Sequence, residues 1–488
     1  MSAGADRRDG RRARLRRGLG LLLALYLASA AWQAWKPLPP GIGEAQPLRA
    51  SADVRFLADR TWVDAEGRRH SEQVIFDEIL ALIGQAQRLV VLDMFLFNAF
   101  GSAPDEDGRA LSSELSEALA ARLAEVPTLK AVLITDPVNT VYGGVAAPHL
   151  AALEAAGATV IVTDLDRLRA PNPLWSGPWR ACCAWLGNDP HGGWLPSPFG
   201  PERVTLRSYG HLLNFNANHR KTLVVDAGDD WVGLVASANP HDASRAHGNV
   251  ALRFSGPAVL DLLDTEHAVA AMSGTELRLP DPLPVDAPIE DVLGARVQVL
   301  TEGRIRDALL SMLAAAGAGD RIDVAAFYLS HRGVIAALRD AHARGAAVRV
   351  LLDPNRDAFG RTKNGVPNRQ VARELHAAGV PVRWCDTHGE QCHAKLVLLR
   401  RADGDAELVA GSANFTRRNL DDLNLETSLR VLATEDDPAV ADAAAWFEEQ
   451  WSNTPERRYS LPYPAYADDA RLRVLLYRIG EATGLSTF

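Results

Sequence analysis

Residues 218–226 read NHRKTLVVD, and residues 392–400 read CHAKLVLLR. Each stretch contains histidine, any residue and lysine, followed by an apolar run that is typical of a buried strand. Side chains two residues apart share one face of a strand, so His219 and Lys221 are expected to point the same way. The same holds for His393 and Lys395. An imidazole beside a fixed cation suits attack on a phosphate, because the imidazole can act as nucleophile or acid while the ammonium holds anionic oxygens.

A second polar motif, Ser-x-Asn, follows each copy. Its asparagine lies 20 residues after the histidine in the first copy and 21 in the second, and a further asparagine lies twelve residues after each serine. The paired residues are Ser237 and Ser412, Asn239 and Asn414, and Asn249 and Asn424. A single His-x-Lys occurs by chance, but two copies with the same trailing motif indicate one duplicated site.

These residues resemble the phospholipase D superfamily, in which each half carries His-x-Lys-x4-Asp and then Gly-(Gly/Ser)-x-Asn. The second copy, with Gly411 to Phe415 and Leu423 to Glu426, is most similar to bacterial cardiolipin synthases, and the resemblance covers roughly residues 50–455. It implies an α/β fold with two pseudo-symmetric halves, each a mostly parallel or mixed sheet flanked by helices, after an N-terminal membrane helix.

The two copies depart from the family pattern at three positions. Asp226, Glu426 and Gly411 match the pattern, whereas the corresponding positions of the other copy hold Arg400, Ala251 and Ala236. We expect Asp226 to be structural rather than catalytic, because an arginine replaces it in the second copy. An acidic residue behind a histidine fixes its tautomer. Ala251 is therefore expected to leave His393 without the partner that Glu426 provides for the histidine of the opposite half, His219.

The resemblance implies that His219 is the nucleophile and His393 the acid and base, although the residues alone do not order them. Lys221, Lys395, Asn239 and Asn414 are expected to stabilise the phosphoryl oxygens, so the site needs no metal and no cofactor. A supporting shell is expected from Asp226, Ser237, Ser412, Asn249 and Asn424.

The N-terminus has the pattern of a membrane anchor. Residues 1–17 carry seven arginines and two aspartates, and residues 18–35 are nearly all apolar. The arginines are expected to stay cytoplasmic, which places the catalytic body on the periplasmic side of the inner membrane. The alternative is a signal peptide cleaved near Ala28-Ser29-Ala30, after which the body would be secreted. The chain carries −9 and residues 1–17 carry +5, so the rest carries −14. An acidic body argues against a nuclease that grips long nucleic acid.

An internal repeat divides the chain, which at 488 residues is too long for one ordinary core. Alternating helices and strands at 79–95, 111–137 and 153–160 recur at 308–328, 333–354 and 375–382, which predicts βαβ units in a largely parallel sheet. We expect a tail and anchor (1–36), a linker (37–49), a first half (50–296), a second half (297–466) and a C-terminal region (467–488). The C-terminal helix has Leu472, Leu475, Leu476 and Ile479 on one face, and we expect this face to pack against the body rather than lie on the membrane.

The first half carries an insertion (164–210) that the second half lacks. Four of the 11 tryptophans fall within it, at Trp175, Trp179, Trp185 and Trp194. They predict either a satellite hydrophobic cluster or a patch that meets lipid headgroups.

The four cysteines bear on the compartment. Cys385 and Cys392 are expected to form a disulfide in an exported protein, with free thiols or a zinc site that includes His388 as alternatives. Cys182 and Cys183 are expected to be buried small residues.

Taken together, the sequence predicts a membrane-associated phosphatidyltransferase that moves a phosphatidyl group from a phospholipid to an alcohol through a phosphohistidine. Phosphatidylglycerol is the expected lipid, and no nucleic-acid partner is expected. Two alternatives stay open: a phospholipase D or other phosphodiesterase that uses water, and a non-catalytic lipid-binding protein.

Overall fold

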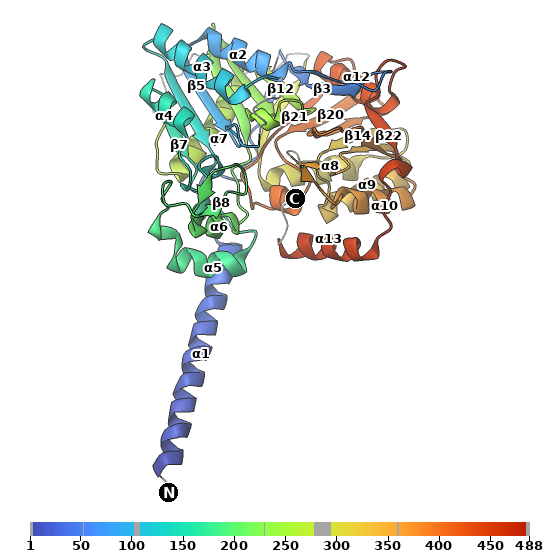
Figure 1. Ribbon diagram of the computed structural model, residues 1–488. Coiled ribbons are helices and arrows are strands. Elements are labelled where there is room, and N and C mark those ends of the chain that lie inside the picture. Colours follow the sequence, from blue (N-terminus) through green and yellow to red (C-terminus); the bar gives the residue numbers. More distant parts are fainter. Residues whose placement is uncertain are drawn as a thin grey trace.

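The computed structural model describes residues 3–51, 53–101, 108–228, 230–277, 294–358 and 361–484. A long N-terminal helix, α1 (Ala3–Trp35), projects from a body that contains two large sheets flanked by helices (Figure 1). Within α1, the segment Arg12–Trp35 is long and apolar enough to cross a membrane. The α/β fold expected from the sequence is confirmed.

The first sheet has seven strands in the order β2-β12-β11-β10-β5-β6-β7. These strands are β2 (Arg55–Ala58), β5 (Ala86–Met94), β6 (Lys130–Thr135), β7 (Thr159–Val162), β10 (Lys221–Ala227), β11 (Asp230–Ala236) and β12 (Val250–Ser255). Only β5, β6 and β7 run parallel, and the other neighbours are antiparallel. The largely parallel sheet predicted from alternating helices and strands is therefore mixed, because β10, β11 and β12 follow one another without an intervening α-helix.

The second sheet has nine strands in the order β1-β13-β21-β20-β19-β14-β15-β18-β22. These strands are β1 (Arg49–Ala50), β13 (Arg296–Thr301), β14 (Arg321–Ala326), β15 (Ala347–Leu352), β18 (Val382–Cys385), β19 (Lys395–Arg400), β20 (Asp405–Gly411), β21 (Thr427–Thr434) and β22 (Ser460–Pro462). Its inner seven strands follow the same order as the first sheet, as the repeat predicts. The pseudo-two-fold axis itself stays a prediction.

Most helices lie outside the two sheets, whereas α7 (Pro257–Met272) and α12 (Pro438–Ser452) contribute to the core that the sheets share. The helices of the first half are α2 (Ile75–Gln85), α3 (Leu111–Glu125), α4 (Pro148–Ala155) and α7 (Pro257–Met272). Those of the second are α8 (Gly303–Ala315), α9 (Arg332–Ala343), α10 (Asn368–Ala377), α11 (Arg417–Leu420), α12 (Pro438–Ser452) and α13 (Arg471–Thr483). Alternation along β10 shows the layering: Leu223 and Val225 join the helices of the first half, whereas Val224 joins the core between the sheets.

The segment expected to be a linker is part of the second sheet's edge. Gln46 donates its backbone N–H to Val299 at 2.9 Å, and β1 pairs antiparallel with β13. The backbone N–H of Gly43 also bonds a side-chain oxygen of Glu302 at 2.7 Å. Residues that precede the first half in sequence thus bind the second half, which ties the two together.

The insertion forms α5 (Pro173–Cys182), α6 (Leu206–Leu212), two short strands, β8 (Leu195–Pro196) and β9 (Arg203–Val204), and the 3-10 turns η2 (Leu165–Arg167) and η3 (Ala184–Leu186). The satellite cluster expected from its tryptophans is present in part, and contact with lipid stays a prediction. Trp175 and Trp179 stack at 5.8 Å in a half-buried cluster, whereas Trp185 and Trp194 are exposed.

Two expectations about outlying segments are wrong. The apolar face of α13, with Leu472 and Leu476, is exposed, and the helix instead buries Tyr477, Gly480 and Glu481. Cys182 and Cys183 are not buried but form a disulfide with each other at the end of α5. Helical periodicity locates an apolar face but does not say what covers it.

Candidate active site

Strand register brings the two motifs of each half together. β10 begins at Lys221 and pairs antiparallel with β11, with Thr222 opposite Val235. The residues that follow β11, Ser237 and Asn239, therefore lie beside the start of β10 and its histidine. In the second half, β19 begins at Lys395 and pairs in the same way with β20, which ends at Gly411 just before Ser412 and Asn414.

His219 is held by the opposite half. Its backbone N–H donates to the carbonyl of Leu425 at 2.9 Å. Its Nδ1 lies 2.9 and 3.0 Å from the two carboxylate oxygens of Glu426. The structure therefore brings together the histidine and the acid that the resemblance pairs.

His393 is held in the same way by the first half, but by a different residue type. Its backbone N–H donates to the carbonyl of Gly248 at 2.7 Å, and its Nδ1 lies 3.1 Å from Oδ1 of Asn249. His393 lacks an acidic partner, as expected, but the residue that corresponds to Glu426 is Asn249 rather than Ala251.

The serines identify this correspondence. Ser412 donates its hydroxyl to Glu426 and accepts the N–H of Thr427, while Ser237 donates to Asn249 at 3.2 Å and accepts the N–H of Val250. Asn249 and Glu426 each immediately precede a strand, β12 and β21. Counting twelve residues from each serine pairs Asn249 with Asn424. The structure instead pairs Asn249 with Glu426, because the loop of the second half is two residues longer.

The lysines lie beneath the histidines and are buried. Lys221 Nζ donates to the carbonyl of His219 at 2.6 Å, and Lys395 Nζ donates to that of His393 at 2.5 Å. Each ammonium also lies over a phenylalanine ring, Lys221 at 4.9 Å and Lys395 at 5.2 Å from the ring centroid. The rings belong to Phe95 and Phe327, which follow β5 and β14 and also contact the two imidazoles.

Burial sets the protonation of the histidines. It lowers the pKa of His219 to about 4, against the opposing effect of Glu426 and with the help of the lysine charges. Burial also lowers the pKa of His393 well below its usual range, and Lys395, Lys221 and His219 add to the shift. The mutual effects show that the two motifs lie within electrostatic reach of each other.

Glu426 and the lysines carry the opposite charges of the site. Burial by itself raises the pKa of Glu426, but the charge of His219 and the surrounding hydrogen bonds bring it below its usual value. Burial lowers the pKa of Lys221 to about 7, and it lowers the pKa of Lys395 well below its usual value, where Lys221 adds repulsion. A phosphodiester monoanion would stabilise the charged forms of these cations.

The remaining predicted residues differ in the groups that they contact. Asn239 accepts the N–H of Leu96 at 3.4 Å, whereas Oδ1 of Asn414 is buried with no partner among the described residues. Asn424 accepts the N–H of Ala217 at 3.0 Å and so supports the chain before His219. Asp226 sits at the far end of β10, where it accepts backbone N–H groups at the start of β5.

Two aspartates were missed as site residues. Asp136 accepts the N–H of Asn218 at 2.7 Å, and Asp353 accepts the N–H of Cys392 at 2.8 Å. Each therefore fixes the residue before a motif histidine, and burial raises the pKa of each to about 7. The repeated strand-Asp-Pro pattern after β6 and β15 was the available signal.

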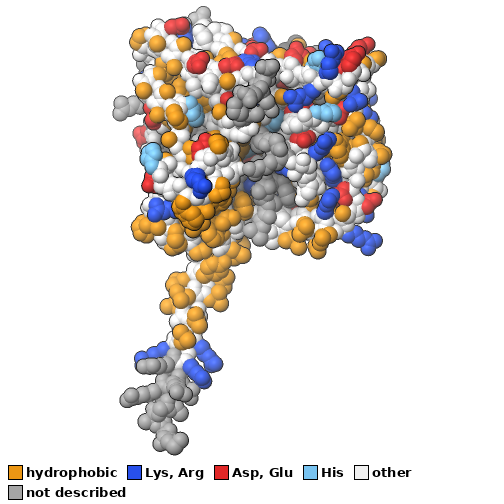
Figure 2. Space-filling model, in the orientation of Figure 1, with side chains coloured by type: hydrophobic (Ala, Val, Ile, Leu, Met, Phe, Trp, Pro, Cys, Tyr) orange, Lys and Arg blue, Asp and Glu red, His pale blue; other side chains and the backbone are white. Residues whose placement is uncertain are grey.

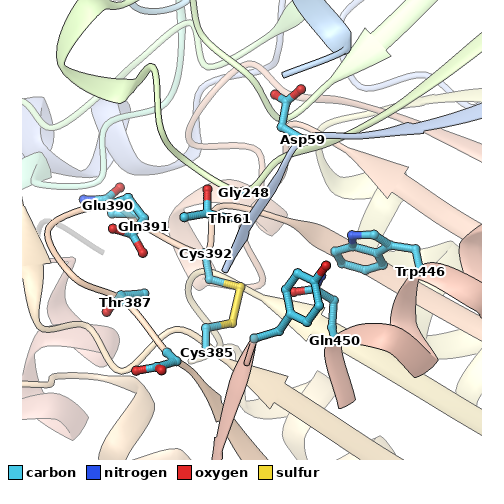
Figure 3. Close-up of a pocket in the computed structure, with 12 residues that line it drawn as sticks. Asp59, Thr61, Gly248, Cys385, Thr387, Glu390, Gln391, Cys392, Trp446 and Gln450 are labelled. Atoms are coloured by element: carbon cyan, nitrogen blue, oxygen red, sulfur yellow. A yellow bond between two sulfur atoms is a disulfide. The ribbon is translucent and has the colours of Figure 1, made fainter. Parts of the chain in front are cut away.

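The Cys385–Cys392 disulfide predicted from the sequence braces the approach to His393. Figure 3 shows this disulfide beside a small pocket lined by both halves, with Asp59 and Gly248 on one side and Trp446 on the other. Neither motif histidine lines this pocket. No group of three or more metal-ligating side chains occurs in the parts of the chain that the structure describes.

Residues 309–451 match the family model of the cardiolipin synthase phospholipase D-like domain. No curated protein sequence matches the chain. The fold is similar to that of phosphatidylserine synthase from Haemophilus influenzae Rd KW20, with a TM-score of 0.56 and 11% identity over 90% of this chain and 96% of that chain.

Two further solved structures are similar at lower scores. Polyphosphate kinase from Porphyromonas gingivalis has a TM-score of 0.45 and 12% identity over 89% of this chain and 54% of its own. Nuc from Salmonella typhimurium, a phospholipase D family member, has a TM-score of 0.27 and 22% identity over 34% of this chain and 99% of its own. The match of residues 309–451 to this family model and the fold shared with the synthase agree with the resemblance drawn from the two repeated motifs.

Proposed function

We propose that this protein is a membrane-anchored phosphatidyltransferase that works through a phosphohistidine. One observation carries the proposal: two histidines, one from each half, have Nδ1 engaged by the opposite half, which leaves Nε2 of each for chemistry. A buried lysine bonds the backbone carbonyl of each histidine, and with Asn239 and Asn414 these lysines would stabilise a phosphoryl group.

In the first step, Nε2 of His219 attacks phosphorus. The bond from phosphorus to the headgroup oxygen breaks, and His393 gives its Nε2 proton to that oxygen. The negative charge of the bound phosphodiester supports protonation of His393, against the burial that lowers its pKa. In the second step, the acceptor hydroxyl gives its proton to His393 and attacks phosphorus, and the bond to His219 breaks.

The partners of the histidines support this order. An imidazole phosphorylated on Nε2 and protonated on Nδ1 is cationic, so the carboxylate of Glu426 would stabilise it. Asn249 is neutral, and a neutral partner suits His393, which must both lose and regain a proton.

The anchor and the disulfides support an exported catalytic body. Four arginines, Arg12, Arg14, Arg16 and Arg17, begin the described apolar segment of α1 and would be retained in the cytoplasm. All four cysteines are paired, which is typical of an oxidising compartment. Phosphatidylglycerol is the proposed donor, and the glycerol headgroup of a second molecule is the proposed acceptor.

The test is incubation of the purified full chain with phosphatidylglycerol vesicles, with lipids and water-soluble products measured together. We expect cardiolipin and free glycerol in equal amounts. Phosphatidic acid with glycerol would instead show hydrolysis, and vesicle binding without turnover would show a lipid-binding protein. The His393→Ala variant is the inactive control.

A further inference from the structure

Helix α13 presents its apolar side to the outside of the molecule. Leu472, Leu475, Leu476 and Ile479, the α13 stripe, follow a spacing of three and four residues and are 68%, 55%, 56% and 48% exposed. A helix that only packs on a body turns this side inward, so the outward direction needs another explanation.

The inward side of α13 is polar and firmly held. Tyr477 donates its hydroxyl to the carbonyl of Ser330 at 3.2 Å. Glu481 accepts the hydroxyl of Ser330 at 2.7 Å and the backbone N–H of Arg417 at 3.0 Å. These buried bonds fix the rotation of the helix, so the stripe cannot turn inward without breaking them.

A second exposed apolar group lies on the insertion. Leu174, Trp185, Leu186 and Trp194, the insertion patch, are 57%, 73%, 49% and 62% exposed. In Figure 1, α5 of the insertion lies where α1 leaves the body, and α13 lies along the same side of the molecule. Figure 2 shows apolar side chains gathered on this side, both around the base of α1 and beneath the second half.

The length of α1 places α5 at the membrane. Its apolar run from Gly18 to Trp35 spans roughly 27 Å at 1.5 Å per residue, which a hydrocarbon core of about 30 Å covers entirely. The body already contacts α1 inside this run: a side chain at Gly177 of α5 would come within 2.9 Å of Ala30, and Tyr26 donates to the carbonyl of Leu174 at 3.0 Å. The bilayer that holds α1 therefore reaches α5.

We propose that the α13 stripe and the insertion patch both rest in the interfacial layer of the phospholipid bilayer that α1 crosses. The inference rests on α1 being the anchor of the proposed function, but not on the chemistry. Trp185 and Trp194 have the residue type that favours the headgroup layer. Arg471 is exposed on α13 and matches anionic headgroups, as in helices that lie on membranes, whereas the exposed Arg478 pairs with Glu374 at 3.1 Å. The α13 stripe and the insertion patch thus give the body two contacts with the bilayer, which restrict rotation of the second half about α1.

The test measures the depth of nitroxide labels in the full chain, reconstituted in nanodiscs of phosphatidylglycerol and phosphatidylethanolamine. The native cysteines are paired, so single-cysteine variants can be labelled without reductant. The variants are Leu476→Cys in the stripe, Trp185→Cys in the patch, Leu23→Cys in α1 and Ala81→Cys in α2 as the matched exposed control. Collisions with oxygen and with a water-soluble nickel complex distinguish lipid from water.

We expect the labels at Leu476 and Trp185 to favour oxygen, as the label at Leu23 does, and the label at Ala81 to favour the nickel complex. A water-like label at Leu476 would overturn the inference. So would spin–spin broadening at Leu476 that disappears on dilution with unlabelled chain, because a second copy would then cover the stripe. A water-like label at Leu23 would count against the anchor of the proposed function, which keeps the two failures distinguishable.

Discussion

The two histidines of the site differ in the group that holds Nδ1. Glu426 is a buried carboxylate beside His219, and Asn249 is a buried amide beside His393. A carboxylate favours the imidazolium, whereas an amide oxygen orients the ring without adding charge. This difference makes the two halves chemically unequal although their folds correspond.

Replacing Asn249 by aspartate tests this inequality. The added negative charge raises the pKa of His393, because it stabilises the protonated imidazole. We expect Asn249→Asp to move the alkaline limb of the pH profile of kcat/KM to higher pH, and Asn249→Ala to lower kcat by about 10- to 100-fold because the orienting bond is lost. An alkaline limb that stays in place in the aspartate variant would show that His393 is not the acid that titrates there.

Burial of the charged Lys221 is expected to lower the free energy of unfolding, while the same ammonium serves the proposed reaction. Its folded pKa of about 7 lies below its usual 10.5, so the unfolded chain binds more protons between these values. The cost is present in full below pH 7 and disappears as the pH rises toward 10.5. We expect Lys221→Met to abolish turnover and to raise the free energy of unfolding near pH 6 by a few kcal/mol. Denaturant unfolding from pH 6 to 10 measures this, and a gain that grows with pH would contradict it.

At the scale of elements, the strands and helices could be predicted from sequence and most details of the loops could not. Apolar runs of strand length and helical periodicity located α2, β5, α8 and β14, and glycines with positive φ, Gly157 and Gly379, end α4 and α10 as expected. The alignment of Glu426 with Ala251 was wrong because the loop that follows Ser412 is two residues longer than the loop that follows Ser237. The apolar pattern of the strands does not indicate the length of such loops. The hydrogen-bond partners of the histidine Nδ1 atoms, Glu426 and Asn249, come from the opposite half, so only the three-dimensional structure identifies them.

The sequence also could not predict whether the apolar face of α13 turns toward the body or away from it. An amphipathic pattern is the same whether protein or lipid covers the apolar face. Since Leu472 and Leu476 contribute little to the packed core, we expect Leu472→Gln/Leu476→Gln to change the free energy of unfolding by less than about 0.5 kcal/mol. The same variant should lose turnover with vesicles but not with a monomeric short-chain lipid. Thermal unfolding and both assays, with Ala81→Gln as the control, measure this. A large loss of stability would mean that the stripe packs on protein after all.

At the scale of the whole molecule, the proposed site takes residues from both halves. Apolar residues of both sheets form one core, and the buried Arg220 of the first half pairs with Glu302 of the second at 2.8 Å. Glu302 also accepts the N–H of Glu426 at 3.0 Å, so the ion pair continues to the partner of His219. The sequence predicted that the two motifs would meet, because a duplicated half-site is complete only with both copies.

The most direct test of one shared site is to trap the intermediate with a phosphodiester whose leaving group needs no protonation, such as a p-nitrophenyl ester of phosphatidic acid. We expect His393→Ala to release a burst of nitrophenol and then stall, with the phosphatidyl group found on His219 by peptide mass spectrometry. His219→Ala should give neither the burst nor a labelled peptide. A labelled histidine in His219→Ala, or full turnover in His393→Ala, would contradict the account that both imidazoles act on one phosphorus atom.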